Sequence, residues 1–164
     1  MRHHAPRRSR LTSVLTASAA TALTTLPALA TGLATAPVAA AGDDPSARVL
    51  QLTNAARAEA GCQPLKRDTR LDKAAQGYAR SMAASGNFSH TGTDGSDFAD
   101  RIRAAGHRSP GGENIAQGQS SADEVVADWM DSPGHRKNIE NCSFRTLGLG
   151  LAGDDHYWVQ DFGR

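Results

Sequence analysis

Three short clusters place side chains capable of chemistry beside residues that favour loops. His90 follows a Phe-Ser pair, Glu113 follows Pro-Gly-Gly, and His135 follows Pro-Gly. Since Gly and Pro let the backbone turn sharply, each cluster can bring its side chain to the rim of a cleft. Two neutral imidazoles and one carboxylate would suit zinc with an open fourth position, where the metal polarises a water. Without a metal, the trio could offer a general base and a general acid.

The same residues also have simpler interpretations. A single loop histidine usually makes structural hydrogen bonds, and the intervals of 23 and 22 residues between the three groups are not diagnostic. The sequence contains neither His-Glu-x-x-His nor Gly-x-Ser-x-Gly. We interpret His107 and His156 as structural. Asp94, Asp97 and Asp100 miss the calcium-loop pattern, and we expect them to cap helices or to be solvated.

The first 41 residues have the layout of a secretory signal peptide. Residues 1–10 contain four Arg and no acid, and residues 11–40 are an uncharged run rich in Ala, Thr and Leu. Small-residue cleavage patterns end at Ala30 and at Ala41. These features predict that residues 1–41 direct export and do not belong to the fold.

A membrane anchor is the alternative interpretation of this leader. It is disfavoured because two Pro and one Gly interrupt the run, which is also rich in Thr. The pair Arg7-Arg8 would allow a twin-arginine export route. We expect residues 42–164 to form one secreted, extracellular domain without a membrane span.

The charge balance of the exported part excludes one class of partner. Without the four leader arginines, 14 basic residues face 17 acidic ones, so the net charge is near −3 and not +1. No basic run remains, and we therefore expect no nucleic-acid partner. The remaining length suffices for one modest core, and we expect a monomer.

Both cysteines, Cys62 and Cys142, lie in the exported part. An oxidising compartment favours a single disulfide between them, which would close a loop of about 80 residues and remove the candidate thiol nucleophiles. The alternative is two free, buried thiols.

Hydrophobic periodicity and cap signals predict a mixture of helices and strands. Helices are expected over residues 45–60, 69–85, 96–105 and 121–132, with Asp44 capping the first and Thr69, paired with Asp72, capping the second. Strands are expected over 146–152 and 156–162 as an antiparallel hairpin, with 115–117 as a third strand. No βαβ alternation is present, so the pattern favours an α+β fold with an antiparallel sheet. The expected core aromatics are Trp129, Phe144, Tyr157, Trp158 and Phe162.

Six motifs follow one another in an order that resembles the CAP superfamily of SCP-like extracellular domains, in its bacterial secreted branch. The superfamily includes cysteine-rich secretory proteins, venom antigen 5 and plant pathogenesis-related proteins. The resemblance covers about residues 46–163, and it is carried by Leu52–Arg57 with Gly61–Leu65, Leu71–Ala75 with Phe88-Ser89-His90, Gly112–Ile115, Trp129–Ile139, Leu147–Gly150 and Tyr157–Gly163.

The resemblance implies an α-β-α sandwich around a central antiparallel sheet. It also implies a cleft of two His and two acidic residues, which in some members binds zinc or another divalent cation. His90, Glu113 and His135 match three of the four positions, whereas Ser132 stands where the family has its second Glu. Asp131 is adjacent, but one residue turns a helix by about 100°, so it need not face the cleft.

Three functions remain open at this point. The first is a secreted protein that binds a lipid, a sterol-like molecule, a wall polymer or a protein without catalysis. The second is a divalent-metal-dependent, peptidase-like hydrolase in which His90 and His135 hold the ion and Glu113 is a ligand or the base. The third is a structural module whose polar trio only braces loops.

Overall fold

The computed structural model describes residues 44–164, so the predicted leader and its cleavage sites lie outside the described residues. The elements along this part of the chain are α1 (Pro45–Glu59), β1 (Lys66–Arg67), α2 (Thr69–Ser85), α3 (Phe98–Ala104), β2 (Pro110–Gln117), α4 (Ala122–Asp131), α5 (Pro133–Ile139), β3 (Thr146–Ala152) and β4 (Tyr157–Gly163).

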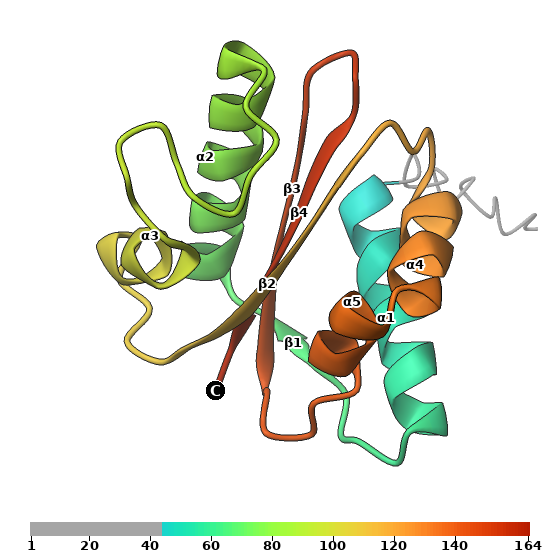
Figure 1. Ribbon diagram of the computed structural model, residues 1–164. Coiled ribbons are helices and arrows are strands. Elements are labelled where there is room, and N and C mark those ends of the chain that lie inside the picture. The colour runs from blue at the N-terminus through green and yellow to red at the C-terminus, as the bar shows by residue number, and fades with distance from the viewer. Residues whose placement is uncertain (1–43) are drawn as a thin grey trace, which may run out of the picture. The chain divides into compact units, whose positions relative to one another are not determined.

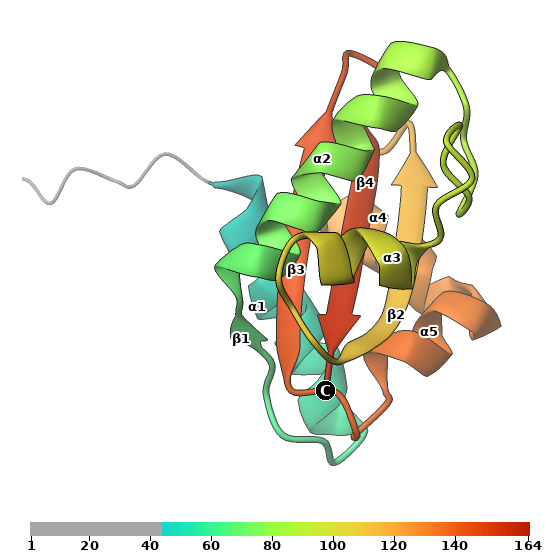
Figure 2. The ribbon, with the colours of Figure 1, turned by 90° about the vertical axis from the view of Figure 1, so that its left-hand side faces the viewer.

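The strands form one sheet in the order β1-β3-β4-β2. β4 pairs antiparallel with both β3 and β2, while the two residues of β1 pair parallel with β3. Helices α2 and α3 cover one face of the sheet, and α1, α4 and α5 cover the other (Figures 1 and 2). The predicted α+β fold, an α-β-α sandwich around an antiparallel sheet, is therefore confirmed, with one short parallel pair added at its edge.

The alternation of side chains along the strands builds a core on each face. The larger core lies against α1 and α4, and the smaller one joins Ile115, Tyr157 and Val159 to α2. The five aromatic residues predicted for the core are all buried.

Helix α2 approaches β3 without intervening side chains. A β-carbon at Gly148 would lie 2.0 Å from the carbonyl carbon of Leu71, so only glycine allows this contact. The helix also completes the hydrogen bonding of the exposed side of β3, because Asp72 Oδ1 accepts from Leu149 N–H at 2.9 Å and Gln76 bonds both backbone groups of Leu151. The second helix thereby fixes the position of the loop that leaves it.

Several predicted details differ from the structure. Asp68, and not Thr69, caps α2, because its side chain accepts from Arg70 N–H. The third predicted strand is eight residues long and not three. Helix α5 was not predicted, because Pro133 and Gly134 were interpreted as a loop; here Pro133 occupies the first helical turn, which needs no backbone donor.

The predicted disulfide between Cys62 and Cys142 is present. Beside it, the fully buried guanidinium of Arg57 donates to four backbone carbonyl oxygens, those of Gln63, Ile139, Asn141 and Phe144. The disulfide and Arg57 together tie the end of α1 to the end of α5. Within residues 44–164, no helix is both long and apolar enough to cross a membrane.

Candidate functional site

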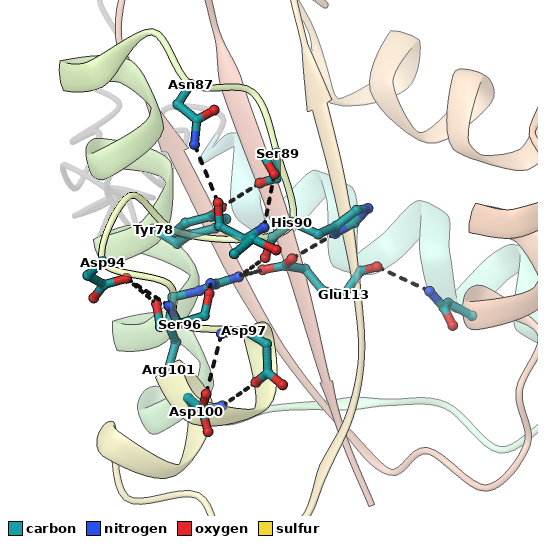
Figure 3. Close-up of polar contacts among 12 residues, drawn as sticks. Tyr78, Asn87, Ser89, His90, Asp94, Ser96, Asp97, Asp100, Arg101 and Glu113 are labelled. Carbon is teal, nitrogen blue, oxygen red and sulfur yellow. Dashed lines mark hydrogen bonds and ion pairs between the residues drawn. The ribbon is translucent and has the colours of Figure 1, made fainter.

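The loop after α2 and the strand β2 bring two of the three predicted residues into direct contact. His90 Nδ1 lies 2.8 Å from Glu113 Oε1 (Figure 3). The Glu113 side chain is 1% exposed, while that of His90 is 55% exposed. The buried carboxylate therefore holds one edge of an imidazole whose other edge faces solvent.

Arg101 of α3 contacts the second oxygen of the Glu113 carboxylate. The sequence analysis did not identify Arg101 as a site residue. Its guanidinium donates to Glu113 Oε2 at 2.8 Å and to the carbonyl oxygens of His90 and Ser96 (Figure 3). It also stacks 3.4 Å over the ring of Tyr78. Because Arg101 donates to the carboxylate, Glu113 is held as an anion, and His90 Nδ1 must then carry the hydrogen of their bond.

Tyr78 of α2 anchors the loop that carries His90. Its hydroxyl donates to the carbonyl oxygen of Ser89, directly before His90. Burial raises the pKa of Tyr78 above its usual value, so the hydroxyl keeps its hydrogen. Tyr78 lies within the helix expected over residues 69–85, but the sequence analysis assigned its hydroxyl group no role at the site.

His135 lies near this pair without bonding to Glu113. Burial, and then the charge of a protonated His90, lower the pKa of His135 below its usual value. Its backbone carbonyl accepts from the side chain of Asn114 in β2 at 3.2 Å. The structure thus places the second imidazole within electrostatic reach of the first and favours its neutral form.

A buried chain of amide side chains positions α5 against β2. Asn138 donates to the Glu113 carbonyl and to Asn114 Oδ1, and Asn114 donates in turn to Gln160 Oε1 at 3.0 Å. Gln160 then donates to Thr53 Oγ1 at 2.9 Å. Each amide has both a donor and an acceptor, so this chain fixes the register between α5, β2, β4 and α1.

Asp161 of β4 is a second buried carboxyl group next to the site. It pairs in register with Glu113, so both side chains lie on the same face of the sheet. Burial, and then the charge of Glu113, raise the pKa of Asp161 well above its usual value. Its Oδ1 is buried without a hydrogen-bond partner. Sequence periodicity assigned this residue to a strand but gave it no role.

Ser132 stands at the position where the family has its second acidic residue, so no carboxylate is present there. Ser132 ends α4 and begins α5. Asp131 is exposed and lines a separate hollow of about 660 Å³ with Arg136 and Cys142. It does not join Glu113, in agreement with the expected rotation of one residue around the helix.

The donor set does not fit a three-residue metal site in which Glu113 is a ligand. Both of its oxygens already accept charge-assisted bonds. In the part of the chain that the structure describes, no group of three or more His, Cys, Asp or Glu side chains is arranged to hold a metal ion. A cation would depend on the two imidazoles alone, and its binding stays a prediction.

The remaining candidates have structural contacts. His107 is buried against Gly163 and lies 3.3 Å from Thr146 Oγ1. Asp97 and Asp100 form a capping box at the start of α3, and Asp94 accepts from the backbone and hydroxyl of Ser96.

A cavity of about 320 Å³ adjoins the site between α2 and α3. It shares Tyr78 and Arg101 with the site, and its other walls include small residues such as Ala74, Gly77 and Ala105. Arg101 therefore has the Glu113 carboxylate on one side and open space for a small group on the other.

Comparisons with known proteins agree with the family resemblance of the sequence motifs. A family model described as the cysteine-rich secretory protein family, CAP, matches residues 50–162. The YkwD protein of Bacillus subtilis (strain 168) is 41% identical over 117 residues, which are 70% of this chain and 45% of YkwD. The membrane protein YlbC of the same organism is 32% identical over 70% of this chain and 33% of its own length. This chain therefore spans less than half of either relative.

Solved structures show the same architecture. An extracellular protein with an SCP domain from Bacillus anthracis str. Ames has a TM-score of 0.67 and 30% identity, over 73% of this chain and 40% of that one. An outer surface protein from Borrelia burgdorferi has a TM-score of 0.63 over 71% of this chain and 89% of its own, and its 24% identity supports the fold alone.

Proposed function

The chain belongs to the cysteine-rich secretory protein (CAP) family, and from this premise we propose that it acts outside the cell or in the cell envelope, where it binds a ligand at the His90–Glu113 site without catalysis. A lipid, a sterol-like molecule, a wall polymer or a protein is the class of ligand expected. The signal-peptide pattern of residues 1–41 and the relative described as extracellular support the location.

One observation argues against Glu113 as a catalytic base: both of its oxygens are engaged. A general base must accept a proton from a reacting group, and it does so from a position within hydrogen-bond reach of that group. Glu113 is 1% exposed and lies between His90 and Arg101, so it stabilises its neighbours and does not meet a substrate. The exposed edge of His90 and the adjacent cavity remain as the binding features.

The test is equilibrium binding of the full chain to a fixed panel. The panel contains phosphatidylcholine vesicles, the same vesicles with a sterol, and purified cell-wall fragments freed of phosphate polymers. We expect saturable binding to one of them, which His90→Ala weakens at least about tenfold, equivalent to about 1.4 kcal/mol. His156→Asn is the matched control, because it removes an imidazole at a turn outside the site, and Asn tolerates its positive φ of 49°.

Two outcomes would contradict the proposal. One is the absence of saturable binding to every member of the panel. The other is binding that His90→Ala leaves unchanged, since the ligand would then lie elsewhere on the domain.

The alternative function is a divalent-metal-dependent hydrolase. It is favoured by the lowered pKa of His135, because a neutral imidazole is the form that ligates metals. Zinc calorimetry on the full chain, on His90→Ala and on His135→Ala separates the two functions. Binding that both variants abolish would support the hydrolase, whereas no binding, or binding that both variants retain, would eliminate a metal at these residues.

A further inference from the structure

We propose that one end of the sheet is a binding surface for the phosphate groups of a linear poly(alditol phosphate), a phosphodiester polyanion without nucleobases, separate from the His90–Glu113 site. The surface, which we call the basic pole, consists of five exposed cationic residues, Lys66, Arg103, Arg108, Arg145 and Arg164. The proposal goes beyond the proposed function, because it uses none of the residues of that site.

Backbone contacts bring these residues together from four separate segments. Lys66 N–H donates to the carbonyl oxygen of Arg145, and Arg145 N–H donates to that of Gly163. Arg164 N–H donates to the carbonyl oxygen of Ser109, directly after Arg108. The segments meet at the end of the sheet where β1, the start of β3 and the end of β4 lie, at the bottom of Figure 1.

Two arginines of the basic pole face a shared hollow. Its volume is about 410 Å³, and its lining residues are Arg103, Gly106, His107 and Arg108. His107 is buried there, so the two exposed guanidinium groups form the reachable polar part of the hollow. A phosphate group that enters it can accept from both, which is the geometry that guanidinium groups favour.

Charge is concentrated at this end. Asp100, 3.6 Å from Arg103, is the only carboxylate in the described part of the chain within ion-pair distance of the basic pole. The neighbouring pairs Arg67–Asp72 and Arg70–Asp68 are each neutral. Five cations and one anion leave +4 from side chains, although residues 42–164 together carry 14 basic and 17 acidic side chains. The exported domain is therefore acidic overall with one strongly basic end.

Arg145 and Arg164 show the same excess of positive charge at one pair of neighbouring positions. Thr146 and Gly163 are partners in the β3–β4 ladder, so Arg145 and Arg164 are the next facing positions beyond it. Like charges at facing positions are unfavourable. Their guanidinium groups bond only carbonyl oxygens, those of Cys142, Phe144 and Pro110, in the contacts that the structure describes. An anion bound between them would relieve the repulsion.

The side chains of the basic pole favour a polymer over a membrane surface as the ligand. Proteins that lie on bilayers combine cations with apolar side chains that enter the lipid. Within residues 44–164, Phe88 is the only large hydrophobic side chain that is exposed, and it precedes His90, away from the basic pole. A flexible chain of phosphodiesters can contact the pole alone.

The experiment measures binding of the full chain to poly(glycerol phosphate) by fluorescence anisotropy. We expect saturable binding that weakens steeply between about 50 and 200 mM salt, as phosphate contacts do. Arg103→Gln/Arg108→Gln should weaken binding about tenfold or more and lower the slope of log affinity against log salt by about 2. Arg136→Gln/Lys137→Gln, which removes two exposed cations on α5, is the control. It should weaken polymer binding, and lower the salt slope, much less than Arg103→Gln/Arg108→Gln does.

Other outcomes would overturn the proposal. An equal loss in both double variants would show non-specific attraction to the whole domain. Equal binding to poly-L-glutamate would exclude selectivity for phosphate, and tighter binding to phosphatidylglycerol vesicles would replace the polymer with a membrane. His90→Ala should retain polymer binding, so failure of the proposed function and failure of this proposal are distinguishable.

Discussion

At the scale of single residues, the site depends on how a deeply buried carboxylate is compensated. A buried charge is costly unless it is paired and hydrogen-bonded, and Glu113 meets both conditions through His90 and Arg101. Oδ1 of Asp161, its neighbour across the sheet, has no hydrogen-bond partner, and the pKa of Asp161 is raised. The two carboxyl groups differ because Arg101 serves only one of them directly.

Arg101→Met tests this pairing. It keeps an unbranched side chain over Tyr78 but leaves Glu113 without its cation, so we expect the free energy of unfolding to fall by about 3 kcal/mol. Adding Glu113→Gln should restore more than half of that loss, because no buried charge remains. Urea unfolding of both single variants and the double variant measures the coupling. A coupling below about 0.5 kcal/mol would mean that the two residues are energetically independent.

Asp161→Asn tests the cost of the second carboxyl group. Because the folded-state pKa is raised above 3.8, the folded state holds its proton more tightly than the unfolded state, and wild-type stability falls as pH rises from 3.8 through the raised value. Asn has no proton to lose. The stability advantage of the variant should therefore grow as pH rises through the raised pKa of Asp161. Thermal unfolding of both proteins from about pH 4 to pH 9 measures the difference, and a constant difference would contradict the raised pKa.

Residue types and motifs predicted His90 and Glu113 as partners, but not Arg101 or Asp161. Those two contacts depend on how α3 packs over the sheet and how β4 pairs with β2, which no local pattern encodes. The signal available was indirect: a carboxylate expected in a protein interior requires a cation, and Arg101 lies on the helix directly before the Glu113 motif.

At the scale of elements, α2 and β2 determine where the site lies. α2 rests on the glycines of β3 and ends at the loop that carries His90, while β2 carries Glu113 and contacts α5 through Asn114. The periodicities of 3.6 and 2 residues predicted the bounds of α2 and β3 as the structure has them, because these elements bury regular faces. Helix α5 and strand β1 were missed, since seven and two residues are too short for a periodic signal and form through tertiary contacts.

Gly148→Ala tests the close approach of α2. The added methyl would meet backbone atoms of Leu71 and Asp72 at 2.0 to 2.4 Å, so we expect a loss of about 3 kcal/mol or more in unfolding free energy. Gly77→Ala is the matched control within α2, where nothing lies within 4 Å of the added atom. It should stabilise the protein by about 0.5–1 kcal/mol through helix propensity. Similar effects of the two substitutions in urea unfolding would contradict the packing described.

At the scale of the whole molecule, the disulfide and the sheet join segments that are distant in the sequence. Cys62 and Cys142 are 80 residues apart, and Arg57 adds bonds to the same region. Cys62→Ser/Cys142→Ser should lower the unfolding free energy by about 4 kcal/mol, mainly because the unfolded chain gains freedom. Reduced wild-type protein should match the double variant in urea unfolding. A change below about 1 kcal/mol would mean that the other contacts hold these segments without the bond.

Composition and the order of motifs predicted the fold class and family at this scale, because they depend on many residues at once. The asymmetric charge of the basic pole was not predicted, since its cations come from four segments that only the folded sheet brings together.

The central claim is that Glu113 is an anion fully engaged by its partners and holds the Nδ1–H of His90, so that Nε2 is the exposed nitrogen. Long-range ¹H–¹⁵N correlation of the imidazoles at about pH 9, where a histidine ring is neutral, reports the tautomer directly. We predict that His90 carries its hydrogen on Nδ1 in the wild type and loses that preference in Glu113→Ala. A hydrogen on Nε2 in the wild type would contradict the claim.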